Sequence, residues 1–204
     1  MKTASIPVHN KEINTRMLVS IAMLSAVSIV LSYIKITPPL SPSFAKMDIS
    51  DFPALIAAFT FGPISGVIVE LIKNAFGLFS TVTGGVGELA NFLIGTSMAI
   101  CSGTIYQYKK SRKGAILSLS VGTIVMMAIG AVVNYFILLP LYSTFMPMDT
   151  LIQSFSAFIP FIRTRFDIVL YSTIPFNLVK GLLISIIMFV VYKKLSPILK
   201  GTKS

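Results

Sequence analysis

Long apolar stretches alternate along the chain with short polar or proline-containing segments. Residues 17–34 carry no charge and are almost all apolar, and the stretch is long enough to cross a bilayer as a helix. The polar residues before it are not followed by a small-residue cleavage site, so we interpret it as an uncleaved membrane helix. The same criterion predicts further spans at residues 86–108, 114–139 and 173–192.

Prolines and polar residues set the expected ends of the last two spans. We expect Pro140 to end the span at 114–139, because proline has no backbone N–H to continue a helix. The final span is predicted to begin at Ser172 or Thr173 as N-cap, with Pro175 in its first turn.

Residues 51–79 are long for one span and short for two. Gly62 and Pro63 interrupt the stretch, and Ser50 or Asp51 precedes it as a plausible N-cap. The dense basic cluster at residues 109–113 belongs on the cytoplasmic side together with the basic N-terminal segment. An even number of crossings must then separate them, which favours two short or tilted helices. The alternative is one long crossing, which would place the cluster outside.

The pattern therefore predicts an all-α integral membrane protein with six transmembrane helices and cytoplasmic N and C termini. We interpret residues 1–204 as a single membrane domain. It consists of a cytoplasmic tail (1–16), a six-helix core (17–192) and a second cytoplasmic tail (193–204). Residues 141–172 form a partly apolar outer segment that we expect to lie at the membrane interface or to pack over the helices.

Composition agrees with this interpretation. Only 12% of the residues are charged and 54% are hydrophobic, whereas soluble domains carry about 25% charged residues. A cytosolic enzyme and a disordered chain are both excluded. The net charge of +10 reflects cytoplasmic loops rather than nucleic-acid binding. One Cys and one His exclude an intramolecular disulfide and most zinc sites, so we expect neither a metal nor an enzyme active site.

Polar side chains occur at similar depth in four predicted helices. Because such groups are costly inside a membrane, we expect them to line a pocket that opens outward above an aliphatic floor. Glu70 and Lys73 are spaced to form an ion pair, for which a structural role is the simpler interpretation. Asn134 could instead join helices, and Lys180 could extend to the headgroups. The pocket candidates are Lys73, Asn74, Glu88, Asn91, Asn134, Asn177 and Lys180, with Phe44, Tyr135 and Phe176 as ring-stacking candidates.

Four sequence runs together resemble one family, the substrate-binding S components of energy-coupling factor vitamin transporters, and within it the riboflavin-binding members. The runs are KMDISDFPAL (46–55), ELIKN (70–74), TGGVGELANF (83–92) and PFNLVKG (175–181). The resemblance covers almost the whole chain, from Met17 to about Tyr192. It implies a subunit that binds riboflavin at the extracellular face for ATP-driven uptake by partner proteins.

The resemblance also implies a site. Asn134, Asn177 and Lys180 match positions that hold the polar edge of the flavin ring. Two segments match regions that cover the ligand: Phe44, Ala45, Lys46, Met47 and Asp48 in the first, and Thr83, Gly84 and Gly85 in the second. Ala22 and Ala26 match a small-residue motif that contacts a transmembrane coupling subunit (EcfT). Two ABC-type ATPase subunits would complete the importer.

The residue chemistry suits a flavin, because asparagine amides match a ring edge of alternating donors and acceptors. Backbone groups of the glycine loop could meet the ribityl hydroxyls. FMN stays open as a ligand, since Lys46, Arg163 and Arg165 could supply cations at the rim. Further alternatives are an S component for another vitamin, a flavin-displaying receptor without transport, and a lipid-modifying membrane enzyme. The last is disfavoured by the lack of acidic or histidine pairs.

Overall fold

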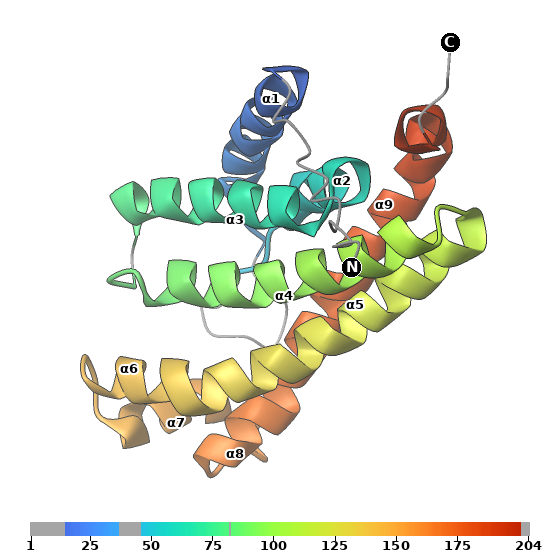
Figure 1. The fold of residues 1–204 in the computed structure, drawn as a ribbon. Coiled ribbons are helices and arrows are strands. Elements are labelled where there is room, and N and C mark those ends of the chain that lie inside the picture. Colours follow the sequence, from blue (N-terminus) through green and yellow to red (C-terminus); the bar gives the residue numbers. More distant parts are fainter. Residues whose placement is uncertain (1–14, 37–45, 82, 201–204) are drawn as a thin grey trace, which may run out of the picture.

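The structure is a computed structural model that describes residues 15–36, 46–81 and 83–200, and helices account for nearly all of its regular structure (Figure 1). The single β-contact in the described part is an isolated antiparallel bridge between Ile36 and Met47. The all-α prediction is therefore confirmed. The helices are α1 (Thr15–Ser32), α2 (Asp51–Phe61), α3 (Pro63–Gly77), the 3-10 turn η1 (Leu78–Ser80), α4 (Val86–Tyr108), α5 (Arg112–Val133), the π-turn η2 (Asn134–Leu138), α6 (Leu139–Ser143), α7 (Met148–Ser156), α8 (Arg165–Ile168), the π-turn η3 (Val169–Thr173) and α9 (Ile174–Lys200).

Residues 51–79 divide where the sequence predicts. Gly62 separates α2 from α3 with a φ of 108°, a conformation that favours glycine, and Pro63 opens α3. Five helical stretches in the described chain are long and apolar enough to cross a membrane, and α2 is a shorter apolar helix. At about 1.5 Å per residue, α2 is only about 16 Å long. The sixth crossing and the orientation of the termini stay predictions.

Pro140 does not end the fifth span, contrary to expectation. Apolar helix continues from Arg112 to Ser143, and the chain passes the proline through a π-turn. The N–H of Leu139 donates to the carbonyl of Asn134, five residues back. Because Pro140 has no N–H for the carbonyl four residues before it, the wider turn lets the helix continue.

The last span has the same feature. Its apolar helix runs from Arg165 to Val191, so Ser172 and Thr173 lie within the π-turn η3 instead of capping a helix. The cap is Thr164, whose hydroxyl accepts from the N–H of Asp167 while the Asp167 carboxylate accepts from the N–H of Thr164. Helix α9 extends to Lys200, so the expected tail at 193–204 is partly helical.

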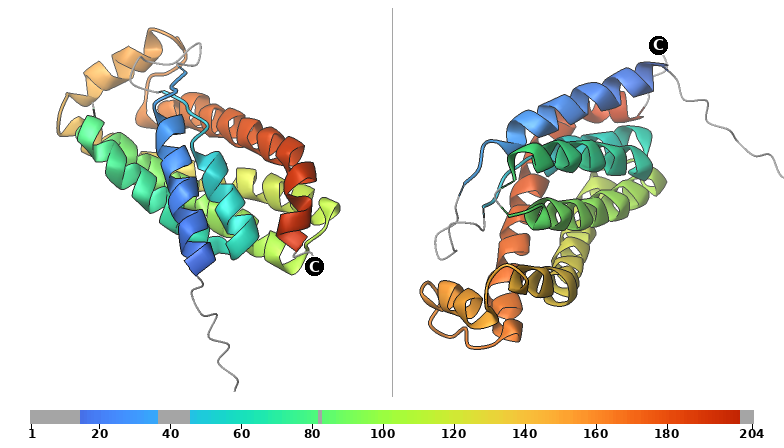
Figure 2. Two further views of the ribbon diagram at one scale, coloured as in Figure 1. Left: turned by 90° about the horizontal axis from the view of Figure 1, so that it is seen from above. Right: turned by 90° about the vertical axis from the view of Figure 1, so that its left-hand side faces the viewer.

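The long helices pack into one bundle. Helices α3 and α4 lie side by side, α5 packs along α4, and α9 contacts α2 and α5 (Figures 1 and 2). Glycines permit close contact: a Cβ at Gly66 would lie 2.8 Å from the Ala54 carbonyl oxygen, and one at Gly103 2.9 Å from the Ala58 Cβ. The predicted small-residue stripe of α4, Gly95, Ala99 and Gly103, thus packs against α2 and α3.

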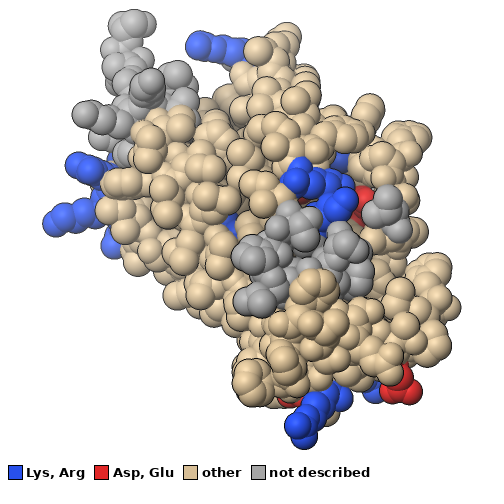
Figure 3. All heavy atoms as spheres, turned by 180° about the vertical axis from the view of Figure 1, so that it is seen from behind, with Lys and Arg blue, Asp and Glu red and all other residues tan. Residues whose placement is uncertain are grey.

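An apolar core fills the half of the bundle that contains the end of α2 and the start of α5. It includes Leu55, Phe59, Ile94, Met98, Tyr106, Leu119, Met126, Ile184 and Met188. The rings of Phe59 and Tyr106 stack at 4.2 Å between centroids. The outer surface is also largely apolar, with few charged groups on the face drawn in Figure 3. Such a surface is typical of a chain that contacts lipid.

Candidate functional site

A pocket of about 280 Å³ lies at the other end of the bundle. It is enclosed by the end of α1, the segment before α2, helices α3, α4 and α9, and both π-turns. Its polar lining comprises Ser32, Tyr33, Lys35, Lys46, Asp48, Lys73, Asn74, Ser80, Thr83, Glu88, Asn91, Asn134, Tyr142, Ser172, Thr173, Asn177 and Lys180. Its apolar lining includes Ala90, Ile94, Leu138, Leu139, Phe155 and Phe176.

All seven polar positions predicted on the helices line this pocket, among them Lys73 and Asn74 from α3 and Glu88 from α4. Asn134 comes from η2, Asn91 from α4, and Asn177 and Lys180 from α9. The apolar core lies next to them, and Ile94 belongs to both. The expected polar pocket above an aliphatic floor is therefore present.

Some candidates lie elsewhere. Met47 is buried, forms the backbone bridge to Ile36 and is not part of the lining. Gly84 and Gly85 also do not line the pocket. Tyr135 turns away because it follows Asn134 directly in the helix, and it packs edge-on against Phe136 with centroids 5.0 Å apart. The remaining two candidates, Phe44 and Ala45, lie outside the described residues.

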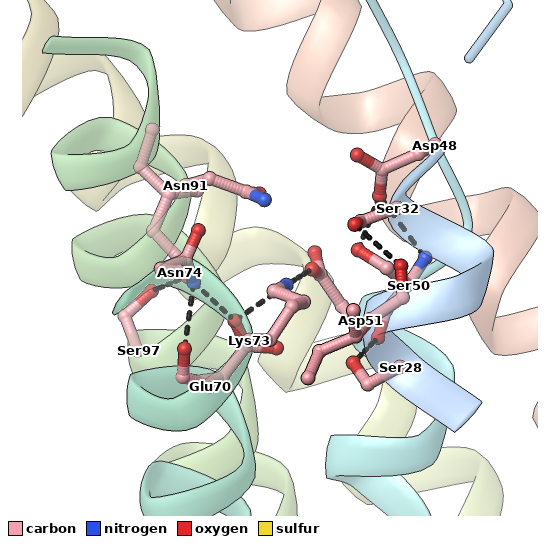
Figure 4. Close-up of polar contacts among 12 residues, drawn as sticks. Ser28, Ser32, Asp48, Ser50, Asp51, Glu70, Lys73, Asn74, Asn91 and Ser97 are labelled. Atoms are coloured by element: carbon pink, nitrogen blue, oxygen red, sulfur yellow. Dashed lines mark hydrogen bonds and ion pairs between the residues drawn. The ribbon is translucent and has the colours of Figure 1, made fainter. Parts of the chain in front are cut away.

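A buried ionic network lies on one side of the pocket (Figure 4). Lys73 Nζ is 2.5 Å from Asp51 Oδ1 and 2.7 Å from Glu70 Oε2, and all three side chains are at most 2% exposed. The predicted pairing of Glu70 with Lys73 is confirmed. Sequence reasoning treated Asp51 only as a possible helix cap, so its place in this network is new.

Lys180 extends the network into the pocket. Its Nζ is 2.9 Å from Asp51 Oδ2, 3.9 Å from Asp48 Oδ1 and 2.7 Å from Asn91 Oδ1, to which it donates a hydrogen bond. The side chain is only 6% exposed, so it does not extend to a headgroup region. Its ion pairs offset the cost of burying the charge.

The segment before α2 is tied to α1. The Ser28 hydroxyl donates to the Ser50 carbonyl at 2.5 Å. Ser50 in turn donates to Asp48 Oδ1 from its backbone N–H at 3.0 Å and from its hydroxyl at 2.5 Å. The side chain of Ser50 thus orients Asp48 rather than capping α2. These bonds hold Asp48 at the wall of the pocket.

The glycine loop satisfies its own polar groups. The Thr81 hydroxyl accepts from the N–H of Thr83 and of Gly85, and the Thr83 hydroxyl accepts from the N–H of Gly87. Glu88 accepts from the Thr81 hydroxyl at 2.7 Å. The N–H groups of Gly85 and Gly87 are therefore not available for ribityl hydroxyls, and Glu88 is the acceptor that the loop presents to the pocket.

The outer segment contributes residues that sequence reasoning missed. Tyr142 and Phe155 line the pocket, so part of residues 141–172 packs over the helices, the second of the two expected placements. The sequence offered one signal for the π-turns that also line the pocket: each of them is followed closely by a proline, Pro140 or Pro175. Arg163 and Arg165, expected at the rim, are exposed and outside the lining. The cations that line the mouth are Lys35 and Lys46, both exposed.

The pocket combines an apolar wall with several amides and two buried ammonium groups, those of Lys73 and Lys180. The side-chain oxygen of Asn134 is buried and has no hydrogen-bond partner in the described chain. Asn177 donates to the Thr173 carbonyl at 2.9 Å, which orients its amide. This arrangement is suited to binding a small, largely apolar molecule with a hydrogen-bonding edge. Within the described residues, no cluster of three or more His, Cys, Asp or Glu side chains could hold a metal ion.

A second surface lies on α1. Ala22 and Ala26 are both exposed, whereas Ile21, Ser25 and Ser28 of the same helix are buried. The α1 face with the small-residue pair is thus accessible on this chain.

Comparison with known proteins agrees on one family. The family described as "ECF transporter, substrate-specific component" matches residues 16–192. "Riboflavin transporter RibU" of Staphylococcus aureus (strain TCH60) is 38% identical over 94% of this chain and 95% of its own length. "Riboflavin transporter FmnP" of Bacillus subtilis (strain 168) is 32% identical over 92% of this chain and 95% of its own. A solved chain from "Structure and mechanism of the S component of a bacterial ECF transporter" is similar with a TM-score of 0.73 at 38% identity, covering 91% of this chain and 98% of that one.

Proposed function

This chain belongs to the substrate-specific components of the ECF transporters, multi-pass bacterial membrane proteins, and on that premise we propose that it captures riboflavin at the extracellular face. Its relatives that are named riboflavin transporters match almost end to end. The chain is a transport component and not an enzyme.

The observation that carries the proposal is the unpartnered Asn134 oxygen in the same pocket as Asn177 and Lys180. A flavin ring has a polar edge with an N–H donor between carbonyl acceptors. Asn134 can accept from such a donor, and Lys180 or an amide N–H can donate to a neighbouring acceptor. An unpaired buried acceptor is costly, so a ligand that supplies a donor stabilises the site.

The apolar end of the flavin ring and the ribityl chain also have matching groups in the pocket. The apolar wall at Ile94, Leu138 and Leu139 suits the dimethylbenzene end of the ring, and Phe176 can contact a ring face. Glu88 and the threonine hydroxyls beside it can meet ribityl hydroxyls.

Riboflavin is favoured over its phosphate ester by the charges inside the pocket. Lys73 and Lys180 are both paired with carboxylates, so neither is free to neutralise a phosphate. An FMN phosphate would need the exposed Lys35 and Lys46 at the mouth. We therefore expect FMN to compete with riboflavin but to bind more weakly.

We further propose that the exposed Ala22–Ala26 face of α1 contacts the transmembrane coupling subunit, which acts with two ABC ATPases. Small residues let a partner helix approach closely in the membrane. We also retain six crossings with cytoplasmic termini, in which α2 completes the count as a short or tilted crossing.

The direct test is to purify the protein from riboflavin-grown cells and identify the flavin extracted from it. Riboflavin at one per chain supports the proposal. A colourless protein that also fails to take up added riboflavin contradicts it, and an extract of a different vitamin would favour the alternative S-component specificity.

A further inference from the structure

Asp51 connects the two buried lysines of the site. Its Oδ1 is 2.5 Å from Lys73 Nζ, and its Oδ2 is 2.9 Å from Lys180 Nζ. The three groups come from different helices, α2, α3 and α9. A single carboxylate that does not line the pocket thus joins two lysines that do.

The Asp51 carboxylate is held in place by Lys73, which itself pairs with Glu70. Lys73 is held between Asp51 and Glu70, as Figure 4 shows, and Glu70 Oε2 accepts from Asn74 at 3.2 Å. Asp51 also opens α2, where the helix dipole favours a negative charge. Both oxygens therefore have defined directions, and neither can rotate without breaking an ion pair.

The ammonium of Lys180 has more N–H donors than acceptors within hydrogen-bond distance in the described chain. It has three N–H groups. The contacts with Asn91 Oδ1 and Asp51 Oδ2 account for at most two of them. The distance of 3.9 Å to Asp48 is too long for a hydrogen bond. At least one donor thus lacks an acceptor within the described chain, and the side chain lines the pocket.

We propose that Asp51 is a positioning residue for the ligand: through Lys180, it sets the direction in which the remaining ammonium N–H meets a carbonyl or ring nitrogen of the flavin. The inference rests on the proposed function, because it takes a flavin as the molecule in the pocket. Asp51 itself is not assigned a ligand contact, since it does not line the pocket.

A purely structural role for Asp51 makes a different prediction. If the carboxylate only held helices together, its removal would affect ligand affinity to the same extent whether Lys180 is present or not. If it acts through Lys180, the effect must shrink once Lys180 is gone, because coupled residues are not additive.

The test is a double-mutant cycle in riboflavin affinity, measured by fluorescence quenching on the purified full-length protein. The variants are Asp51→Asn, Lys180→Met and the pair. We expect Asp51→Asn to weaken binding about tenfold in the native background and less than about threefold in the Lys180→Met background, a coupling of the size seen for contacting residues.

Glu70→Gln is the matched control. It also removes a buried carboxylate from Lys73, but Glu70 has no ion pair with Lys180. We expect it to change riboflavin affinity by less than about threefold. If Asp51→Asn fails to fold, Asp51→Glu replaces it in the cycle, because it keeps the charge and moves the carboxylate.

The outcomes separate the two claims. Equal effects of the Asp51 substitution in both backgrounds would overturn the positioning role while leaving riboflavin binding intact, as would a loss from Glu70→Gln equal to that from Asp51→Asn. Failure of the unmodified protein to bind riboflavin would overturn the proposed function, and this inference with it.

Discussion

Lys180 of α9 donates a hydrogen bond of 2.7 Å to the side-chain oxygen of Asn91 in α4, joining two helices that are far apart in the sequence. Both residues line the pocket, and the bond brings together two polar groups that a lipid-facing helix would not retain. The position of the Lys180 ammonium in the pocket therefore depends on the packing of α9 against α4, because neither helix alone would fix it.

Asn134→Ala should weaken riboflavin binding by roughly 1–3 kcal/mol, the usual cost of losing a buried hydrogen bond. The Asn134 oxygen is buried and unpartnered in the described chain, so the ligand is its expected donor. Titration of purified protein measures the change. Tyr135→Phe is the neighbouring control, and it should leave affinity unaltered because Tyr135 is outside the pocket. Native affinity in Asn134→Ala would show that the polar ring edge lies elsewhere.

Gly130→Ala should impair the site without touching the ligand. A Cβ at Gly130 would lie 2.6 Å from Asn177 Nδ2, so the amide must move. Loss of its orientation should cost about 1–3 kcal/mol of binding free energy. Gly122→Ala is the control on the same helix: its Cβ would meet Ser102, away from the pocket. It should lower the melting temperature while the folded protein keeps its affinity, and equal affinity losses in both variants would contradict the assignment.

Ala22→Trp should leave riboflavin binding intact and abolish uptake by cells that contain the complete transporter. The residue is exposed on α1 and distant from the pocket lining, so only a partner would meet the new ring. Val27→Trp serves as control, because Val27 is also exposed on α1 but points well away from the Ala22–Ala26 line. The division of roles fails if Ala22→Trp reduces affinity as strongly as uptake, or if Val27→Trp blocks uptake equally.

Thr164→Ala should destabilise the protein by about 1 kcal/mol, because it removes one half of a capping box. Thr164 is not part of the pocket lining, so riboflavin affinity of the folded protein should not change. Thermal unfolding in detergent, with and without riboflavin, measures both quantities. An unaltered melting temperature would mean that the cap does not stabilise the helix it begins.

The sequence was a good guide where the physics is local. Hydropathy located the long helices, and the pair Gly62 and Pro63 marked the break between α2 and α3. Depth along the predicted spans also brought Asn134, Asn177 and Lys180 to one pocket. These results follow because the cost of a polar group in a membrane depends mainly on its position along the helix.

The sequence failed where tertiary packing decides the outcome. Pro140 was expected to end a helix, but a π-turn with the bond from Leu139 to Asn134 carries the helix past it. Such a turn is rare, so the proline alone did not indicate it. Likewise, nothing local indicates that Asp51 reaches two lysines on other helices, because that contact depends on how α2 docks against α3 and α9.

The central claim is that this pocket binds riboflavin, and the most direct measurement is a fluorescence titration of flavin-free protein with riboflavin. The account predicts quenching that saturates at one riboflavin per chain, displacement by FMN only at higher concentration, and weaker binding in Lys180→Met. Undiminished riboflavin fluorescence at all protein concentrations, or binding that is identical in Lys180→Met and Asn134→Ala, would contradict it.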